Sequence, residues 1–190
     1  MRLANSERSW GWGARALHWI MAALILFQLG LGLRMTVFTP DLLARFALTQ
    51  VHKSWGSVIF ALALLRLGWR IANRASPRLP AGTPPWQVRA AGASHALLYL
   101  LMIALPLSGW VAAAASPVQD MLGIENRVFD WFALPDPWVP GEKTVADAAA
   151  AFHRFAALAL AGLLSLHVAA ALRHHFVDRD DVLVRMTFGG

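Results

Sequence analysis

The chain has 190 residues, of which 57% are hydrophobic and only 15% are charged. Soluble domains carry about 25% charged residues, so the composition excludes an ordinary soluble domain and favours a membrane protein. The net charge of +6 does not indicate nucleic-acid binding, because the arginines lie beside apolar runs rather than along a polar face. The chain has no cysteine, which excludes disulfides, thiolate-ligated zinc, iron–sulfur clusters and covalently attached c-type haem.

The apolar residues are concentrated in four blocks, which in chain order are residues 14–35, 51–71, 93–115 and 148–173. Each block is close to the ~20 residues that a helix needs to cross ~30 Å of hydrocarbon. We therefore predict an all-α membrane protein, a four-transmembrane-helix bundle that residues 1–190 form as a single domain.

The first block has an alternative interpretation as a signal peptide, because Arg2, Arg8 and Arg15 precede an apolar stretch. The stretch is too long for the apolar region of a signal peptide, contains His18 and lacks a clear cleavage site. We therefore expect it to be a membrane span.

Start signals precede the last two blocks. Thr83 is followed by two prolines, and Thr144 has Asp147 three residues later. The first pattern predicts a helix cap at Thr83 and the second predicts a capping box that begins at Thr144. Both helices are therefore expected to begin before they enter the bilayer.

The orientation of the four spans follows from the lysines and arginines between them. Of the 17 basic residues, eleven lie in the N-terminal segment, the 66–92 connection and the C-terminal tail, which leaves 17 − 11 = 6 on the other side. Because basic residues accumulate on the cytoplasmic side, we expect both termini in the cytoplasm and the acidic 116–147 loop outside.

Five of the seven histidines lie within or at the ends of the four spans. They are His18, His52, His95, His153 and His167. Ionisable residues in membrane helices are costly and mark function. A single histidine of this kind is more often an interfacial or interhelical hydrogen-bonding residue, whereas five together favour a cofactor site.

The predicted topology sorts these histidines by depth. His52 and His153 fall at the outer level, and the inner level has three candidates in His18, His95 and His167. His153 and His167 are fourteen residues apart on one helix, so they return to within about 40° of the same face and lie ~21 Å apart along the axis. One helix therefore presents two imidazoles to the bundle interior at two depths.

Paired imidazoles in an apolar bundle favour haem over zinc. Zinc takes three or four protein ligands, and no Asp or Glu lies within the four blocks. Haem iron needs only two axial ligands, because the porphyrin supplies the other four. Two histidine pairs at two depths therefore predict two b-type haems. Small residues one turn from the histidines would leave room for a flat macrocycle; they are Ala14, Ala22, Gly56, Ala149, Ala157 and Ala171.

Basic residues adjoin the histidines at both levels, where they could pair with haem propionates. Lys53 and Arg154 follow the outer histidines directly, and Arg15 and Arg173 lie near the inner ones. The alternative is that they are cations that extend to the membrane interface.

Four stretches of the chain resemble the bacterial cytochrome b561 family, whose domain is similar to the b-type cytochrome subunit of nickel–iron hydrogenases. They are "RALHW" at 15–19, "VHKSWG" at 51–56, "SHALLYLLMIALPLSGW" at 94–110 and "FHRFAALALAGLLSLHVAAALRHHFVDRDDVLVRM" at 152–186. The resemblance implies four helices, two non-covalent haems b and exchange of electrons with the quinone pool in a bacterial inner membrane.

Carried over by motif, the resemblance implies that His18 and His167 hold the inner haem and that His52 and His153 hold the outer one. His95 is then left without an iron. It is expected to lie near the inner haem or a quinone headgroup, or to be an ordinary hydrogen-bonded histidine at a helix start.

The expected function is transfer of electrons between a donor at the outer face and ubiquinone. Some relatives oxidise superoxide, although six acidic residues in the 120–147 segment oppose the attraction of an anion. The alternative is a membrane anchor that relays electrons for a soluble dehydrogenase or hydrogenase. The tryptophan-rich residues 128–140 would then be a docking surface, or else an interfacial aromatic belt. A third, haem-free alternative is a small transporter or scaffold that uses its histidines as proton relays.

Overall fold

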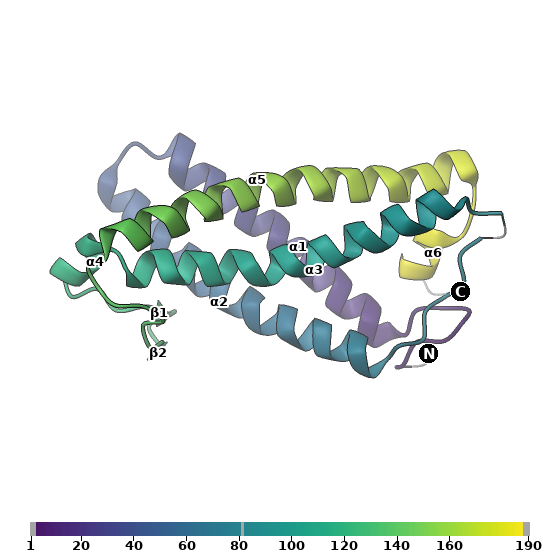
Figure 1. The fold of residues 1–190 in the computed structure, drawn as a ribbon, viewed down its shortest axis with the longest axis horizontal. Coiled ribbons are helices and arrows are strands. Elements are labelled where there is room, and N and C mark those ends of the chain that lie inside the picture. The colour runs from purple at the N-terminus through teal and green to yellow at the C-terminus, as the bar shows by residue number, and fades with distance from the viewer. Residues whose placement is uncertain (1–2, 81, 188–190) are drawn as a thin grey trace.

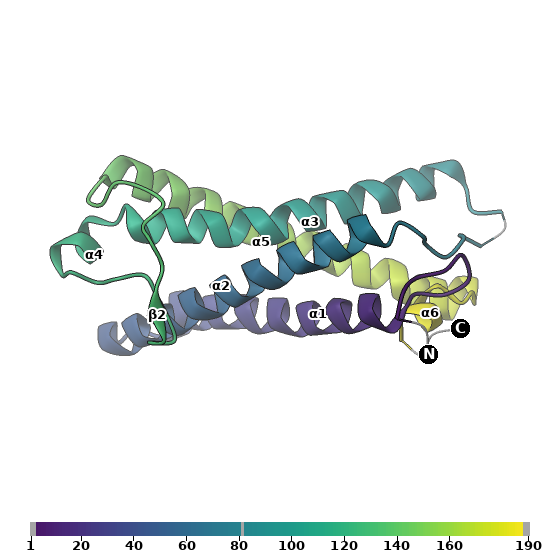
Figure 2. The same ribbon diagram turned by 90° about the horizontal axis from the view of Figure 1, so that it is seen from below.

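The structure is a computed structural model that describes residues 3–80 and 82–187. Four long helices run side by side along the long axis of the molecule (Figures 1 and 2). They are α1 (Trp12–Leu33), α2 (Leu42–Ala72), α3 (Pro85–Ala114) and α5 (Lys143–Arg173). All four are long and apolar enough to cross a membrane, which confirms the predicted four spans.

Short elements extend and connect the long helices. The π-helical turns η1 (Arg34–Phe38) and η2 (His174–Asp178) continue α1 and α5, and α4 (Pro117–Met121) follows α3. The last helix, α6 (Val182–Thr187), lies at the end of the bundle where α1 begins (Figure 1). There Trp19 Nε1 donates to the Met186 carbonyl at 3.0 Å. Both ends of the described chain are therefore on one side of the bundle.

The long helices begin earlier than the apolar blocks predict. α2 starts at Leu42 because the Asp41 carboxylate accepts a hydrogen bond from the Ala44 amide at 2.7 Å. An acidic N-cap satisfies amides that have no partner within the helix, so the helix extends well beyond the apolar block. The segment from Leu42 to His52 is thus helical.

Both predicted caps are wrong in detail. α3 begins at Pro85 without a side-chain cap, and the Thr83 hydroxyl instead donates to the Pro80 carbonyl at 2.7 Å. α5 begins at Lys143, so Thr144 is already inside the helix. Asp147 pairs with Lys143 one turn earlier. In each case a local hydrogen bond or ion pair competes successfully with the cap.

The predicted all-α fold holds for the bundle but not for the connection between α4 and α5, where the chain forms a small antiparallel hairpin. Strands β1 (Arg127–Val128) and β2 (Phe132–Ala133) pair there. Ser54 Oγ, which is buried in α2, accepts a hydrogen bond from the Phe129 amide at 3.0 Å. Phe129 has a left-handed backbone, with φ of 47°, and its ring contacts Trp55 at 5.3 Å between centroids. These contacts fix the hairpin to α2 close to His52.

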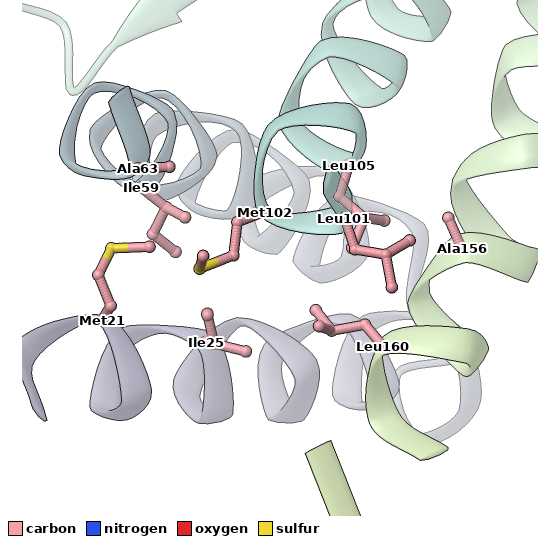
Figure 3. Close-up of a cluster of buried hydrophobic side chains, with 9 residues drawn as sticks. All are labelled: Met21, Ile25, Ile59, Ala63, Leu101, Met102, Leu105, Ala156 and Leu160. Carbon is pink, nitrogen blue, oxygen red and sulfur yellow. The ribbon is translucent and has the colours of Figure 1, made fainter. Parts of the chain in front are cut away.

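The core lies at mid-depth in the bundle and draws on all four long helices, as Figure 3 shows. It consists of Met21, Ile25, Ile59, Ala63, Leu101, Met102, Leu105, Ala156 and Leu160. On α5, Ala156 and Leu160 fall between His153 and His167, so the core separates the two histidine levels. Large apolar residues such as Leu158 and Leu166 are exposed on the outside, as lipid-facing residues of a membrane bundle are.

Candidate functional site

The histidine pair that the sequence assigns to the outer level forms between α2 and α5. The rings of His52 and His153 have centroids 6.1 Å apart and planes at 77°. An imidazole nitrogen binds a first-row metal at about 2 Å, so two rings on opposite sides of one metal ion have centroids about 6 Å apart. The two rings therefore lie at about the separation that binding one metal ion between them would require.

The orientation of His153 is set by hydrogen bonds to α3. His153 Nδ1 lies 3.0 Å from the Leu105 carbonyl oxygen and 3.1 Å from Ser108 Oγ. Because a carbonyl only accepts, Nδ1 carries the ring proton and donates, which leaves Nε2 as the free lone pair. Metal-binding histidines are typically held in this way by a backbone carbonyl.

Glycine 109 leaves the space that the His153 ring occupies. A Cβ at position 109 would lie 3.2 Å from Cε1 and 3.3 Å from Nδ1 of His153, which is tighter than ordinary van der Waals contact. Across the pair, His52 Nδ1 is buried and has no hydrogen-bond partner among the described residues. The outer site thus combines one ring held in a defined orientation with one ring whose nitrogen lacks a partner.

The inner histidines form a cluster of three. The ring centroids of His18 and His167 are 6.2 Å apart, with planes at 53°, and those of His95 and His167 are 5.5 Å apart, with planes at 66°. The structure therefore brings together all three candidates, from α1, α3 and α5. Distance alone does not choose between His18 and His95 as the partner of His167.

Arg66 belongs to the inner cluster and was missed as a site residue in the sequence. Its Nη2 lies 2.9 Å from His18 Nδ1, and its Nε donates to the Tyr99 hydroxyl at 3.4 Å. A signal was present, because Arg66 follows His52 by fourteen residues, the spacing that separates His153 from His167. α2 therefore presents His52 and Arg66 on one face at two depths.

Three of the four basic residues predicted to adjoin the haems have protein partners. Arg15 donates to the Thr187 carbonyl at 3.2 Å, and Lys53 donates to Gln119 Oε1 at 2.7 Å. Arg173 pairs with the Asp178 carboxylate at 3.5 Å. The fourth, Arg154, is exposed.

Helix packing and ligand chemistry both fit a flat macrocycle with two axial ligands. Across the described part of the chain, α5 packs closely against α3 but not against α1 or α2. The histidines of α5 nevertheless face His18 of α1 and His52 of α2. Within residues 3–80 and 82–187, only His174, Asp178 and Asp180 form a group of three His, Asp or Glu side chains whose ligand atoms all lie within 4.8 Å of one another, and neither histidine pair belongs to it. Each pair offers two imidazole nitrogens, which suits an iron whose other four ligands come from a porphyrin.

Comparison with known proteins covers nearly the whole chain. The family model described as "Prokaryotic cytochrome b561" matches residues 9–189. The chain is 31% identical to "Cytochrome b561 homolog 2" of Escherichia coli (strain K12) over 98% of this chain and 95% of that protein. It is 27% identical to "Cytochrome b561 homolog 1" of the same organism over 90% and 92% of the two chains. It is also 27% identical to "Probable superoxide oxidase CybB" of Yersinia pestis over 90% of each chain.

Proposed function

Since the chain belongs to the prokaryotic cytochrome b561 family and is thus a membrane haem b electron-transfer protein, we propose that it holds two haems b and passes electrons across a bacterial inner membrane. The observation that carries the proposal is the pair of interhelical histidine contacts at two depths. Their ring centroids are 6.1 Å apart at one level and 6.2 Å apart at the other. Both pairs draw one histidine from α5.

In this proposal His52 and His153 hold the outer haem, and His18 and His167 hold the inner one. Each haem, when bound, supplies reversible one-electron chemistry at its iron. The chain's own residues orient the ligands and exclude water. The Leu105 carbonyl oxygen lies 3.0 Å from His153 Nδ1 and holds the ring, and a buried apolar core lies between the two levels. With two histidines holding each iron, oxygen binding would be disfavoured.

His95 is assigned to the surroundings of the inner haem or to a quinone headgroup rather than to the iron. Its ring centroid lies 5.5 Å from that of His167, which supports a place beside the inner site. The choice of His18 over His95 as ligand rests on the family motif. If His95→Ala removed the inner haem and His18→Ala spared it, the assignment would be wrong.

The proposed reaction moves electrons from a donor at the outer face to ubiquinone. Superoxide is the donor that we favour, because one relative is called a probable superoxide oxidase. The test is to mix purified full-length protein with superoxide and ubiquinone and to follow haem reduction and quinol formation. Quinol formation without any partner protein supports an enzyme, and its absence rules out superoxide as the donor.

A second candidate function is an anchor that relays electrons for a soluble dehydrogenase or hydrogenase. The observation that favours it is the exposed aromatic surface of the outer loop, where Trp131, Phe132 and Trp138 are 78%, 52% and 48% exposed. Exposed apolar patches of this kind mark sites of protein or membrane contact. Copurification of a redox enzyme that is lost in Trp131→Ser would support the anchor, whereas the interfacial belt predicts no such partner.

The haem count tests the central proposal. Reduced-minus-oxidised spectra and a pyridine haemochrome assay should give two b-type haems per chain. Replacing His52 or His153 with alanine should remove the same haem, and replacing His18 or His167 should remove the other. A haem content near zero would refute the proposal, and one haem per chain would exclude one of the pairs.

A further inference from the structure

Arg66 is a cation near the end of a predicted span and has no anion beside it. It lies in α2, one of the four helices able to cross a membrane. No carboxylate within residues 3–80 and 82–187 lies within ion-pair distance of it. Its partners are His18 and the Tyr99 hydroxyl, and its guanidinium lies 5.7 Å from the Tyr99 ring centroid. Charges in membrane helices normally pair with one another or line a functional site, so Arg66 lacks the counter-ion that its position calls for.

The contact with His18 is incompatible with haem ligation. A guanidinium has donors only, so Arg66 Nη2 donates to His18 Nδ1, at 2.9 Å. If iron bound Nδ1, it would displace the guanidinium directly. If iron bound Nε2, the ring proton would sit on Nδ1 and would face the donor N–H of Arg66. Arg66 must therefore leave His18 whenever His18 becomes a ligand.

Arg70 lies one turn further along the same face of α2. Its Nη1 is buried and has no hydrogen-bond partner among the described residues, and its guanidinium lies 5.6 Å from the Trp10 ring centroid. Residues four apart on a helix are neighbours. Arg66 and Arg70 therefore lie one turn apart on one face of α2, and Arg70 has an unused donor.

We propose that Arg66 and Arg70 are the carboxylate-binding pair of the inner haem, and that Arg66 moves from His18 to a haem propionate when the cofactor binds. This inference rests on the proposed function. Guanidinium groups bind carboxylates through two parallel N–H···O bonds, and a haem b carries two propionates for the two arginines. The pair replaces Arg15 and Arg173, which the sequence suggested and which donate to Thr187 and pair with Asp178. Arg66 and Arg70 are positioning residues, since they act on the cofactor's periphery.

The experiment is a potentiometric titration of the purified full chain with both haems, together with the haem count. A positive charge near a haem stabilises its reduced form, so Arg66→Gln should lower the inner potential and leave the outer one in place. We expect roughly a tenfold change in the ratio of reduced to oxidised inner haem, which equals about 59 mV for one electron. Arg70→Gln should act in the same direction. Arg66→Lys keeps the positive charge but loses the two parallel N–H donors of a guanidinium. Its inner haem should therefore have a potential close to that of the wild type, but should dissociate faster on dilution.

The matched control is Arg89→Gln, which removes one exposed arginine from α3 and should leave both potentials unchanged. Retention of the outer haem shows that a variant is folded. If Arg66→Gln does not accumulate in the membrane, the same measurements are made on Arg70→Gln. The inference would be overturned if the wild type held two haems and both Arg66→Gln and Arg70→Gln kept the wild-type inner potential and retained the inner haem as well as the wild type does. That result would leave the proposed function standing. A wild type without haem would refute the proposed function itself.

Discussion

Substitution of Gly109 by alanine tests whether the His153 ring is held in place by α3. The new Cβ would lie 3.2 Å from Cε1 and 3.3 Å from Nδ1 of His153, so the ring must shift by a few tenths of an ångström. The shift stretches the 3.0 Å hydrogen bond from Nδ1 to the Leu105 carbonyl. A hydrogen bond of this kind contributes about 1 kcal/mol, and loss of the partner that orients a metal ligand lowers metal affinity roughly 10- to 100-fold. Because the hydrogen bond is stretched rather than lost, we expect the affinity for the outer haem to fall about tenfold, the lower end of this range.

The matched control is Gly92→Ala, because Gly92 lies in the same helix and a Cβ there meets nothing within 4 Å. Replacing a helical glycine with alanine stabilises a helix by up to about 1 kcal/mol, so the control should melt slightly higher and keep both haems. The assay is the rate of haem transfer to an excess of apo-myoglobin, resolved by the spectra of the two haems. If Gly109→Ala retained its outer haem as long as Gly92→Ala does, the clash and its consequence would be refuted.

Three further predictions follow from contacts at the outer and inner sites. Ser108→Ala removes the second acceptor of His153 Nδ1, at 3.1 Å, but keeps the Leu105 carbonyl. In the same transfer assay, the rate of outer-haem loss should therefore rise by less than about threefold. Ser54→Ala leaves the Phe129 amide without its 3.0 Å acceptor, which should destabilise the hairpin by about 1–3 kcal/mol and speed proteolysis of the 125–135 segment. Unchanged cleavage would show that this hydrogen bond does not hold the hairpin. Removal of haem should lower the thermal midpoint of unfolding, because a ligand present at 1,000 times its Kd stabilises a folded protein by about 4 kcal/mol. Equal midpoints for the haem-free and haem-bound forms would contradict a haem site formed between helices.

Span positions and the approach of His52 to His153 could be predicted from the sequence, because both depend on position along the chain. Hydropathy over about 20 residues marks a span, and all four predicted spans are present. Alternating helix direction then assigns a depth to each histidine. This assignment puts His52 and His153 at the same level, and their ring centroids lie 6.1 Å apart.

Helix ends and side-chain partners could not be predicted in the same way, because they depend on which of several nearby groups lies closest. Thr83 could cap α3 by its type, but its hydroxyl donates to the Pro80 carbonyl instead. The Leu105 carbonyl that orients His153 comes from a position whose side chain carries no signal. Nothing in the sequence joins Phe129 to Ser54, since these residues are 75 positions apart.

By itself, the sequence determined the number of spans, the depth of each histidine and the fourteen-residue spacing that puts two imidazoles on one face of the last long helix. The tertiary structure alone decided what each imidazole meets across the bundle: His153 meets a carbonyl of α3, His18 meets Arg66, and His167 meets both His18 and His95. The physical reason is that depth and face follow from the fixed rise and twist of a helix, whereas lateral distances between helices follow from how their side chains pack.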